Sequence, residues 1–313
     1  MLKSGPMDEI IEVEGLVKQY GPLKAVDNIS LTVHPGEIFG IIGPNGAGKT
    51  TTLEIIEGLR QADKGHIRVL GLDVTTASNE VNERIGVQLQ ASAYFDYLTL
   101  TEILELFGSF YKRRLSAKAL LDKVGLETKA TTVLKNLSGG QKQRFAVAAS
   151  LVNDPDLIIL DEPTTGLDPA ARRSLWELIR QFHAQGKTIV ITTHYMEEAQ
   201  YLCDRVAIMN RGKIIAVAPI PHLIRALDAP CQVTLTTSKP LHLPQEKLAQ
   251  LNVAEISNDD ANTVQFHVKD PHQFLPQLLA WAEEQPVRVN SIEVAPATLE
   301  DVFLKLTGHR LGD

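Results

Sequence analysis

Cysteine is scarce in this chain, with only Cys203 and Cys231 among 313 residues. The two do not form a C-x-x-C pair, so the sequence supports neither a zinc ribbon nor a redox motif, and it indicates a reducing compartment. Long apolar runs are also missing: Leu157–Leu160 and Ile214–Ile220 fall far short of the roughly 20 residues that a bilayer-spanning helix needs. Residues 1–15 have no apolar signal-peptide core. We therefore expect a chain that does not cross a membrane.

Basic residues are outnumbered, with 31 Lys and Arg against 38 Asp and Glu and a net charge of −7. This balance argues against a protein that binds nucleic acid through the phosphate backbone. The one compact basic cluster, Tyr111–Arg114, is typical of a solvated helix end. We therefore expect no nucleic-acid partner.

Short apolar runs alternate with helix-like stretches over residues 8–220. The runs at 37–42, 156–163 and 187–194 are each introduced by Gly or Pro, which is typical of buried strands. Residues 204–217 read as a hairpin that turns at Asn210–Gly212. Buried strands that alternate with helices predict an α/β fold with a mostly parallel sheet.

Other stretches depart from this pattern and divide the chain. Residues 10–35 and 66–75 show the polar–apolar alternation of a small antiparallel sheet, and residues 95–150 read as a helical subdomain. The composition changes near Pro219–Pro230. We predict one domain over residues 8–220 and a small α+β domain over 229–313.

The strongest chemical motif is the run "GPNGAGKTT", which fits G-x-x-x-x-G-K-[ST], follows a predicted strand and opens a predicted helix. Backbone N–H groups and the helix dipole of such a loop bind phosphate. Lys49 should reach the β- and γ-phosphates of ATP, and the Thr50 hydroxyl should bind Mg²⁺. The predicted nucleotide-binding residues of this P-loop NTPase motif are Gly43, Pro44, Asn45, Gly46, Ala47, Gly48, Lys49, Thr50 and Thr51.

Two acids end the predicted strand "LIILDEP". Adjacent side chains on a strand point in different directions, so Asp161 and Glu162 can do different work. We predict that Asp161 is a Mg²⁺ ligand and that Glu162 polarises the attacking water. His194 ends the next strand and should face the same crevice, where it is a candidate for stabilising the γ-phosphate.

A second glycine-containing loop, "LSGGQ" at Leu137–Gln141, precedes another helix. Its glycines and the helix N-terminus are typical of an anion site, but it has no lysine at the cradle position. The order of Tyr20, the P-loop, Gln90, "LSGGQ", "LIILDEP", "TTGLD" and His194 resembles the nucleotide-binding subunit of ATP-binding cassette (ABC) transporters, over about residues 8–218. The "LSGGQ" run is the discriminating element.

The resemblance implies a role for each matching residue. Tyr20 would stack on adenine, and Gln90 would approach Mg²⁺ and link catalysis to a membrane partner; Gln88 is an alternative register. The second loop would close on the γ-phosphate held by another copy, and Gly166–Asp168 would lie at the seam of a head-to-tail homodimer. The residues implied for this contact are Ser138, Gly139, Gly140, Gln141 and Asp168.

The C-terminal run at 291–310 resembles exporter ATPases of the daunorubicin-resistance type, which pair with type-2 ABC permeases; a tail that only stabilises a dimer is the alternative. Tyr94, Phe95 and Tyr97 fit either a core cluster or a surface that faces the permease. We expect an ATP hydrolase, cytoplasmic and peripheral on the inner face of the cell membrane, with ATP and Mg²⁺ as cofactors. A soluble ABC ATPase that acts on ribosomes or DNA, and a regulator without turnover, are the alternatives.

Overall fold

A computed structural model describes residues 9–89, 95–228, 231–240, 251, 253, 255–260, 262–285 and 287–308. The chain divides into two compact units, Met1–Pro219 and Ile220–Leu311. The second unit begins earlier than residue 229, because α8 (Ile220–Arg225) packs on α11 (Leu299–Thr307). No helix among the described residues combines the length and the apolar character needed to cross a bilayer.

The first unit is built on a six-stranded sheet in the order β10-β9-β3-β8-β7-β6. Its strands β9, β3, β8, β7 and β6 are parallel, as predicted, and β10 is antiparallel to β9. Every residue of β3, β7 and β8 is buried, which is why these strands read as continuous apolar runs. The strands span β3 (Ile38–Ile42), β6 (Ile85–Gln88), β7 (Leu157–Asp161), β8 (Thr188–Thr193), β9 (Arg205–Asn210) and β10 (Lys213–Pro219).

A second sheet, in the order β2-β1-β4-β5, is antiparallel as predicted. Its strands are β1 (Ile11–Tyr20), β2 (Leu23–Val33), β4 (Lys64–Val69) and β5 (Leu72–Asp73). The helices of the unit are α1 (Lys49–Ile56), α2 (Ser78–Asn82), α3 (Leu100–Gly108), α4 (Ala117–Lys123), α5 (Gly139–Ser150), α6 (Pro169–Ala184) and α7 (Met196–Leu202), with short 3₁₀ turns at Glu127–Lys129 and Leu134–Asn136.

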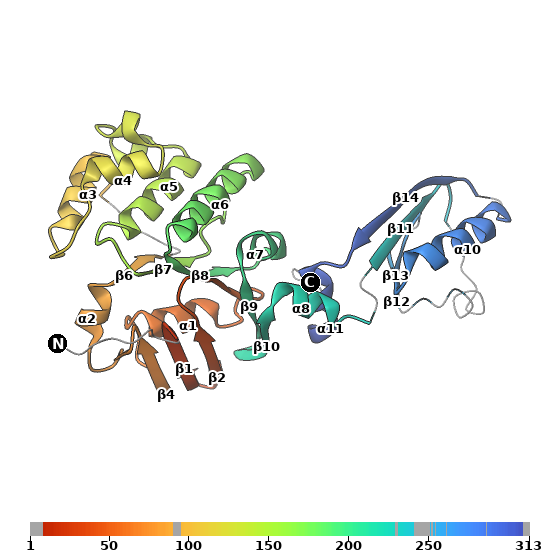
Figure 1. The fold of residues 1–313 in the computed structure, drawn as a ribbon, viewed down its shortest axis with the longest axis horizontal. Coiled ribbons are helices and arrows are strands. Elements are labelled where there is room, and N and C mark those ends of the chain that lie inside the picture. The colour runs from red at the N-terminus through yellow and green to blue at the C-terminus, as the bar shows by residue number, and fades with distance from the viewer. Residues whose placement is uncertain are drawn as a thin grey trace. The chain divides into compact units, whose positions relative to one another are not determined.

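Two cores cover the two faces of the six-stranded sheet. Ile158 and Leu160 of β7 pack into a core with α3, α4, α5 and α6, while Leu157 and Ile159 of the same strand pack with α1 and the antiparallel sheet. Figure 1 shows α3, α4 and α5 on one side of β6–β8 and α1, β1 and β2 on the other. Because side chains alternate between the two faces of the sheet, β7 contributes residues to both cores. It thus joins the helical subdomain to the layer formed by α1 and the antiparallel sheet.

The second unit is a four-stranded antiparallel sheet in the order β12-β13-β11-β14. Its core packs inward-facing residues such as Val233 and Phe266 against Phe274 and Trp281 of α10. Asp270 caps α10 and Pro271 is its first residue, as expected from the Asp-Pro pair. The elements are β11 (Cys231–Thr237), β12 (Glu255–Asp260), β13 (Thr263–Val268), α10 (Pro271–Glu283) and β14 (Val289–Pro296).

Candidate functional site

The loop between β3 and α1 has the backbone of a phosphate cradle. Gly48 has φ 103°, a conformation that L side chains rarely adopt, and a Cβ there would lie 2.2 Å from the Ala25 carbonyl oxygen. At Gly43 a Cβ would lie 2.0 Å from the Met209 carbonyl oxygen. Backbone packing therefore requires both glycines, and the loop leads directly into the N-terminus of α1.

Lys49 is 4% exposed at the base of this loop. Its Nζ donates to the carbonyl oxygens of Gly43 at 2.9 Å and Pro44 at 3.1 Å. The same Nζ lies 3.2 Å from Glu162 Oε1. The P-loop ammonium and the carboxylate predicted to polarise water are therefore direct partners, although 113 positions separate them in the chain (162 − 49).

Glu162 lies just beyond β7 with φ 47°, outside the strand conformation. Its backbone N–H donates to Thr192 Oγ1 at 3.0 Å, and its Oε2 lies 3.1 Å from His194 Nδ1 and accepts from Thr165 Oγ1 at 3.1 Å. The structure thus brings Lys49, Glu162 and His194 together at one point.

Two opposing effects set the pKa of Glu162. Burial acts to raise it, but the charges and hydrogen bonds of Lys49 and His194 outweigh burial and hold the pKa below its ordinary value. At neutral pH the side chain is therefore a carboxylate. An ionised carboxylate with fixed partners can accept a proton or a hydrogen bond from water.

Asp161 is 2% exposed and lies between two hydroxyls. The Thr192 hydroxyl donates to its Oδ1, and the Thr50 hydroxyl of the P-loop is a second hydrogen-bonding partner. Burial raises its pKa, and the charge of Glu162 adds to this, while both hydroxyls and Lys49 lower it. A hydroxyl and a carboxylate side by side are oxygen ligands suited to Mg²⁺.

A cleft of about 890 Å³ collects Tyr20 and six of the nine P-loop residues predicted to bind nucleotide, while Gly43, Pro44 and Ala47 do not line it. It is lined by Tyr20, Leu23, Lys24, Ala25, Asn45, Gly46, Gly48, Lys49, Thr50, Thr51, Glu162, Thr165, His194 and Arg211. Tyr20 is 39% exposed, with the Arg60 guanidinium 5.4 Å from its ring centroid. The cleft runs from this open aromatic face to the charged group around Glu162.

The "LSGGQ" loop does not line this cleft. Ser138 is the N-cap of α5: its Oγ accepts from the Gln141 backbone N–H at 3.3 Å, and Gln141 Oε1 accepts from the Ser138 backbone N–H at 3.0 Å. Ser138 and Gly139 are exposed. Asp168 also lies outside the cleft, as the N-cap of α6, where its carboxylate accepts from Ala170 and Ala171. The P-loop and the "LSGGQ" loop thus lie on separate surfaces of the chain.

Sequence reasoning missed Thr165 and Thr192, which hold Glu162 and Asp161. The signal for Thr192 was its place one residue before the end of β8, at a parallel strand end. Gln88 is the last residue of β6, 2% exposed, with Nε2 donating to the Leu89 carbonyl oxygen at 3.1 Å. Gln90 and Tyr94 lie outside the described residues, so the choice between Gln88 and Gln90 stays a prediction.

Two known protein families match the chain, one in each of its two parts. Residues 26–165 match the family described as ABC transporter. Residues 231–307 match the family described as ATP-binding protein DrrA1-3-like, C-terminal domain. The resemblance of the C-terminal run to the daunorubicin-resistance type is therefore confirmed.

Relatives align over nearly the whole chain. A Nod factor export ATP-binding protein I of Ralstonia nicotianae is 38% identical over 97% of this chain and 95% of its own length. The daunorubicin/doxorubicin resistance ATP-binding protein DrrA of Streptomyces peucetius is 37% identical over 97% of this chain and 94% of its own length.

Solved structures of ATP-binding cassettes match about two thirds of the chain. The ATP-binding subunit of an ABC transporter superposes with a TM-score of 0.62 at 29% identity, covering 69% of this chain and 92% of that one. A dimeric ATP-binding cassette in a post-hydrolysis state with ADP and Pi has a TM-score of 0.61 at 28% identity, covering 67% of this chain and 98% of that one. By its motifs, its fold and these relatives, the chain belongs to the ATP-binding subunits of ABC transporters.

Proposed function

We propose that this chain is the ATP-hydrolysing subunit of an ABC exporter and that it drives a separate membrane permease. The observation that carries the proposal is that Lys49 Nζ lies 3.2 Å and His194 Nδ1 3.1 Å from the Glu162 carboxylate, in a cleft lined by the P-loop. The relatives named for Nod factor export and for drug resistance support the exporter class. They do not favour the soluble ribosome- or DNA-directed alternative.

ATP would lie with its adenine on Tyr20 and its phosphates on residues 43–51. The half-exposed Tyr20 ring offers a flat face at the cleft mouth, and the basic residues Lys18 and Arg60 flank it. Phosphate oxygens would compete with Glu162 and the Gly43 and Pro44 carbonyls for the Lys49 ammonium. Nucleotide binding would therefore loosen the Lys49–Glu162 pair.

Mg²⁺ fits at Thr50 and Asp161, which supply one hydroxyl and one carboxylate. No group of three or more His, Cys, Asp or Glu side chains able to hold a metal occurs in the described ranges, which agrees with an ion held mainly by nucleotide phosphates. Bound Mg²⁺ would neutralise charge on the phosphate oxygens. Gln90 is proposed as a further contact on the basis of the family pattern.

Glu162 is proposed as the general base for the attacking water, and His194 as the group that stabilises the γ-phosphate. Glu162 is already ionised because Lys49 and His194 lower its pKa, so it can accept hydrogen bonds from water at neutral pH. Thr165 and the Thr192–Glu162 backbone contact hold the carboxylate in one orientation. Rate enhancement would come from positioning and charge stabilisation.

A head-to-tail homodimer would complete each site. Ser138 caps a 12-residue helix that begins with Gly139, Gly140 and Gln141, and its exposed N-terminal end could meet a phosphate held by another copy. Asp168, exposed at the start of α6, would lie at the seam. The similar cassette with ADP and Pi was solved as a dimer, which supports this assembly.

The permease is proposed to be of the type-2 class and to dock near the residues after Gln90. Phe95 and Tyr97 are 54% and 78% exposed, which favours a contact surface over a core cluster for these two aromatic residues. The chain would be cytoplasmic and peripheral on the inner face of the cell membrane. We propose no nucleic-acid partner, since the net charge is −7.

Glu162→Gln tests the proposed chemistry. Gln keeps the size of the side chain but cannot take a proton, so the steady-state ATPase rate should fall by about 10²–10⁴-fold. ATP binding should persist, and ATP should trap a dimer visible by sedimentation. A variant that hydrolyses ATP at the wild-type rate would show that Glu162 is not the base.

A further inference from the structure

One basic side chain of the nucleotide cleft has no part in the chemistry proposed above. Arg211 lines the cleft from the two-residue turn that joins β9 to β10, with φ 48° at Arg211 and 78° at Gly212. Positive φ at both central residues is typical of the tight turn of a β-hairpin. A tight turn, rather than a strand or a helix, thus presents Arg211 to the cleft.

Backbone contacts hold this turn against the P-loop and against β2. The Gly212 N–H donates to the Ala47 carbonyl oxygen of the P-loop at 2.9 Å, and the Gly212 carbonyl oxygen accepts from the Asp27 N–H of β2 at 2.8 Å. A Cβ at Gly212 would lie 3.0 Å from the Lys24 carbonyl oxygen, so the turn and β2 approach each other closely. The backbone from which the Arg211 side chain starts is therefore fixed at both walls.

The place of the turn along the cleft follows from the course of β2. This strand begins opposite Tyr20, the proposed adenine contact, and reaches the P-loop at Ala25, whose carbonyl oxygen would lie 2.2 Å from a Cβ at Gly48. The turn meets the same carbonyl oxygen, which would lie 3.1 Å from a Cβ at Gly212. Arg211 therefore stands between the adenine end of the cleft and the phosphate cradle, on the side of the cradle where the α-phosphate enters.

The other ammonium groups that line the cleft have acidic partners. Lys49 lies 3.2 Å from Glu162, and Lys24 lies 3.1 Å from Asp27. Within the described ranges, the exposed Arg211 guanidinium forms neither an ion pair nor a hydrogen bond. An unpaired cation is ordinary on an open surface, but here it stands at a cleft that is proposed to hold a polyanion. Phosphate oxygens match the planar fork of a guanidinium.

We propose that Arg211 binds the α-phosphate of the nucleotide. The inference rests on the proposed function, because it adds a contact to the same nucleotide site. The α-phosphate keeps its charge while the γ-phosphoryl group is transferred, so Arg211 holds the ground state and the transition state equally. Such a contact lowers the KM for ATP and the Kd for ADP, and it leaves kcat unchanged.

Arg211→Gln is the first test. It removes the charge, and because neither residue is β-branched, the cost of the left-handed backbone is nearly the same for both. We expect the Kd for ADP with Mg²⁺, measured by titration calorimetry, and the KM for ATP to rise together by about 5–10-fold, with kcat within about twofold of wild type. Arg211→Lys keeps the charge without the fork, so the Kd for ADP should rise by only about 2–3-fold.

Lys213→Gln is the matched control. Lys213 is a cation of the same hairpin, 66% exposed in its side chain, and it does not line the cleft. Its substitution should leave the Kd for ADP within about twofold of wild type. In 1 M salt the difference between Arg211→Gln and wild type should shrink, because the contact is between charges.

Several outcomes would overturn the inference. A wild-type Kd for ADP in Arg211→Gln would refute it, and equal losses in Arg211→Gln and Lys213→Gln would show a general effect of charge. A rise in the KM for ATP several times larger than the rise in the Kd for ADP would place the guanidinium at the γ-phosphate instead. A similar loss in Arg211→Lys, with a lower Tm in both variants, would mean that the residue only supports the turn.

Failure of the proposed function has a different signature. A wild-type chain that binds ADP without hydrolysing ATP would refute the proposed function, while the calorimetric comparison of Arg211→Gln with wild type would still decide the role of Arg211. Hydrolysis at the wild-type KM by Arg211→Gln would refute the inference alone.

Discussion

Glu57, at the C-terminal end of the P-loop helix, is a buried acid that the proposed chemistry does not use. It is 2% exposed, and neither carboxyl oxygen has a hydrogen-bond partner in the described structure. Burial, together with the negative charges of Asp161 and Glu54, raises its pKa to about 8. The side chain is therefore protonated at neutral pH, in contrast to an ordinary glutamate.

This pKa predicts a pH dependence of stability with a definite sign. Between pH 4.5, the ordinary value, and about 8, folded Glu57 holds a proton that the unfolded chain has lost, so its contribution to stability falls as pH rises. Glu57→Gln lacks this dependence. Its free energy of unfolding relative to wild type should rise between pH 5 and pH 8, by an amount on the order of 3 kcal/mol at most.

Urea unfolding of the first unit at pH 5, 6.5 and 8 measures this difference. Glu80→Gln, which changes an exposed glutamate on α2, is the matched control and should show no trend with pH. A constant difference between Glu57→Gln and wild type across this range would mean that Glu57 titrates normally.

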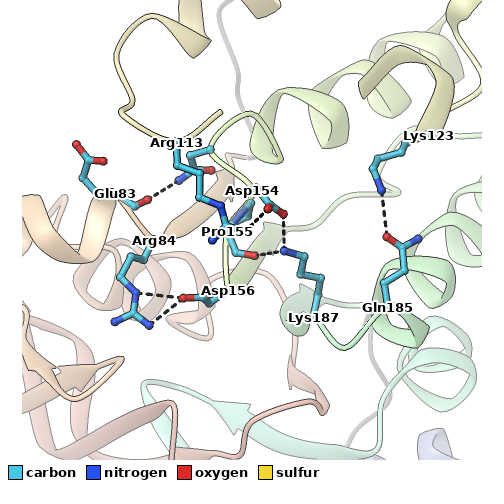
Figure 2. Close-up of polar contacts among 10 residues, drawn as sticks. Glu83, Arg84, Arg113, Lys123, Asp154, Pro155, Asp156, Gln185 and Lys187 are labelled. Atoms are coloured by element: carbon cyan, nitrogen blue, oxygen red, sulfur yellow. Dashed lines mark hydrogen bonds and ion pairs between the residues drawn. The ribbon is translucent and has the colours of Figure 1, made fainter. Parts of the chain in front are cut away.

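At the scale of elements, Asp154 ties the helical subdomain to the central sheet. It lies between α5 and β7 with φ 48°. Lys187, just before β8, donates to Asp154 Oδ1 at 2.8 Å and to the Pro155 carbonyl oxygen at 2.7 Å, and Arg113, beyond α3, pairs with the other carboxylate oxygen (Figure 2). A single carboxylate thus joins three segments where the chain returns to the sheet.

Asp154→Asn should isolate the charge of this junction. Asn tolerates the left-handed backbone as Asp does, so the substitution removes the ion pairs without adding strain. We expect a loss of about 1–2 kcal/mol in the free energy of unfolding, and a smaller loss in 1 M salt, where charges are screened.

Asp156→Asn is the control for Asp154→Asn. Asp156 pairs with Arg84 at 2.8 Å, but both side chains are more than 40% exposed (Figure 2). An exposed pair contributes about 0.5 kcal/mol, so urea unfolding should rank Asp154→Asn as the more harmful change. Equal losses from both variants would contradict a special role for the Asp154 junction.

At the scale of the whole molecule, the P-loop and the Ser138–Gln141 loop lie on separate surfaces. This separation predicts the effect of Ser138→Arg on nucleotide affinity and on dimer formation. Ser138 lies outside the chain's own nucleotide cleft, so the affinity of the monomer for ADP should stay within about twofold of wild type. A bulky cation at the exposed start of α5 should abolish the ATP-dependent dimer, measured by sedimentation in the Glu162→Gln background.

Ser138→Ala separates this effect from helix capping. Both substitutions remove the cap bond to the Gln141 N–H, which is worth about 1 kcal/mol, but Ala adds neither bulk nor charge. Ser138→Ala should therefore weaken the dimer far less than Ser138→Arg. A large loss of monomer ADP affinity in Ser138→Arg would contradict the assignment of this loop to a neighbouring site.

Local patterns were enough to predict much of this protein. The buried strands, the hairpin at Asn210–Gly212 and the P-loop follow from apolar runs, turn residues and glycine spacing, because these depend on neighbours in the chain. Asp161 and Glu162 have different partners, but Glu162 lies beyond the end of β7, so strand alternation is not what separates them. The left-handed φ of Glu162 was not predictable, since the contacts with Thr192 and Lys49 that accompany it come from distant positions.

The sequence by itself determined the family, the nucleotide loop and the fold class. Each follows from short motifs or apolar runs whose residues are neighbours in the chain. Only the tertiary structure decided that Lys49 pairs with Glu162, and that Glu57 and Glu198 are buried acids with raised pKa values. Burial and ion pairing depend on which distant segments pack together, and no local pattern records that.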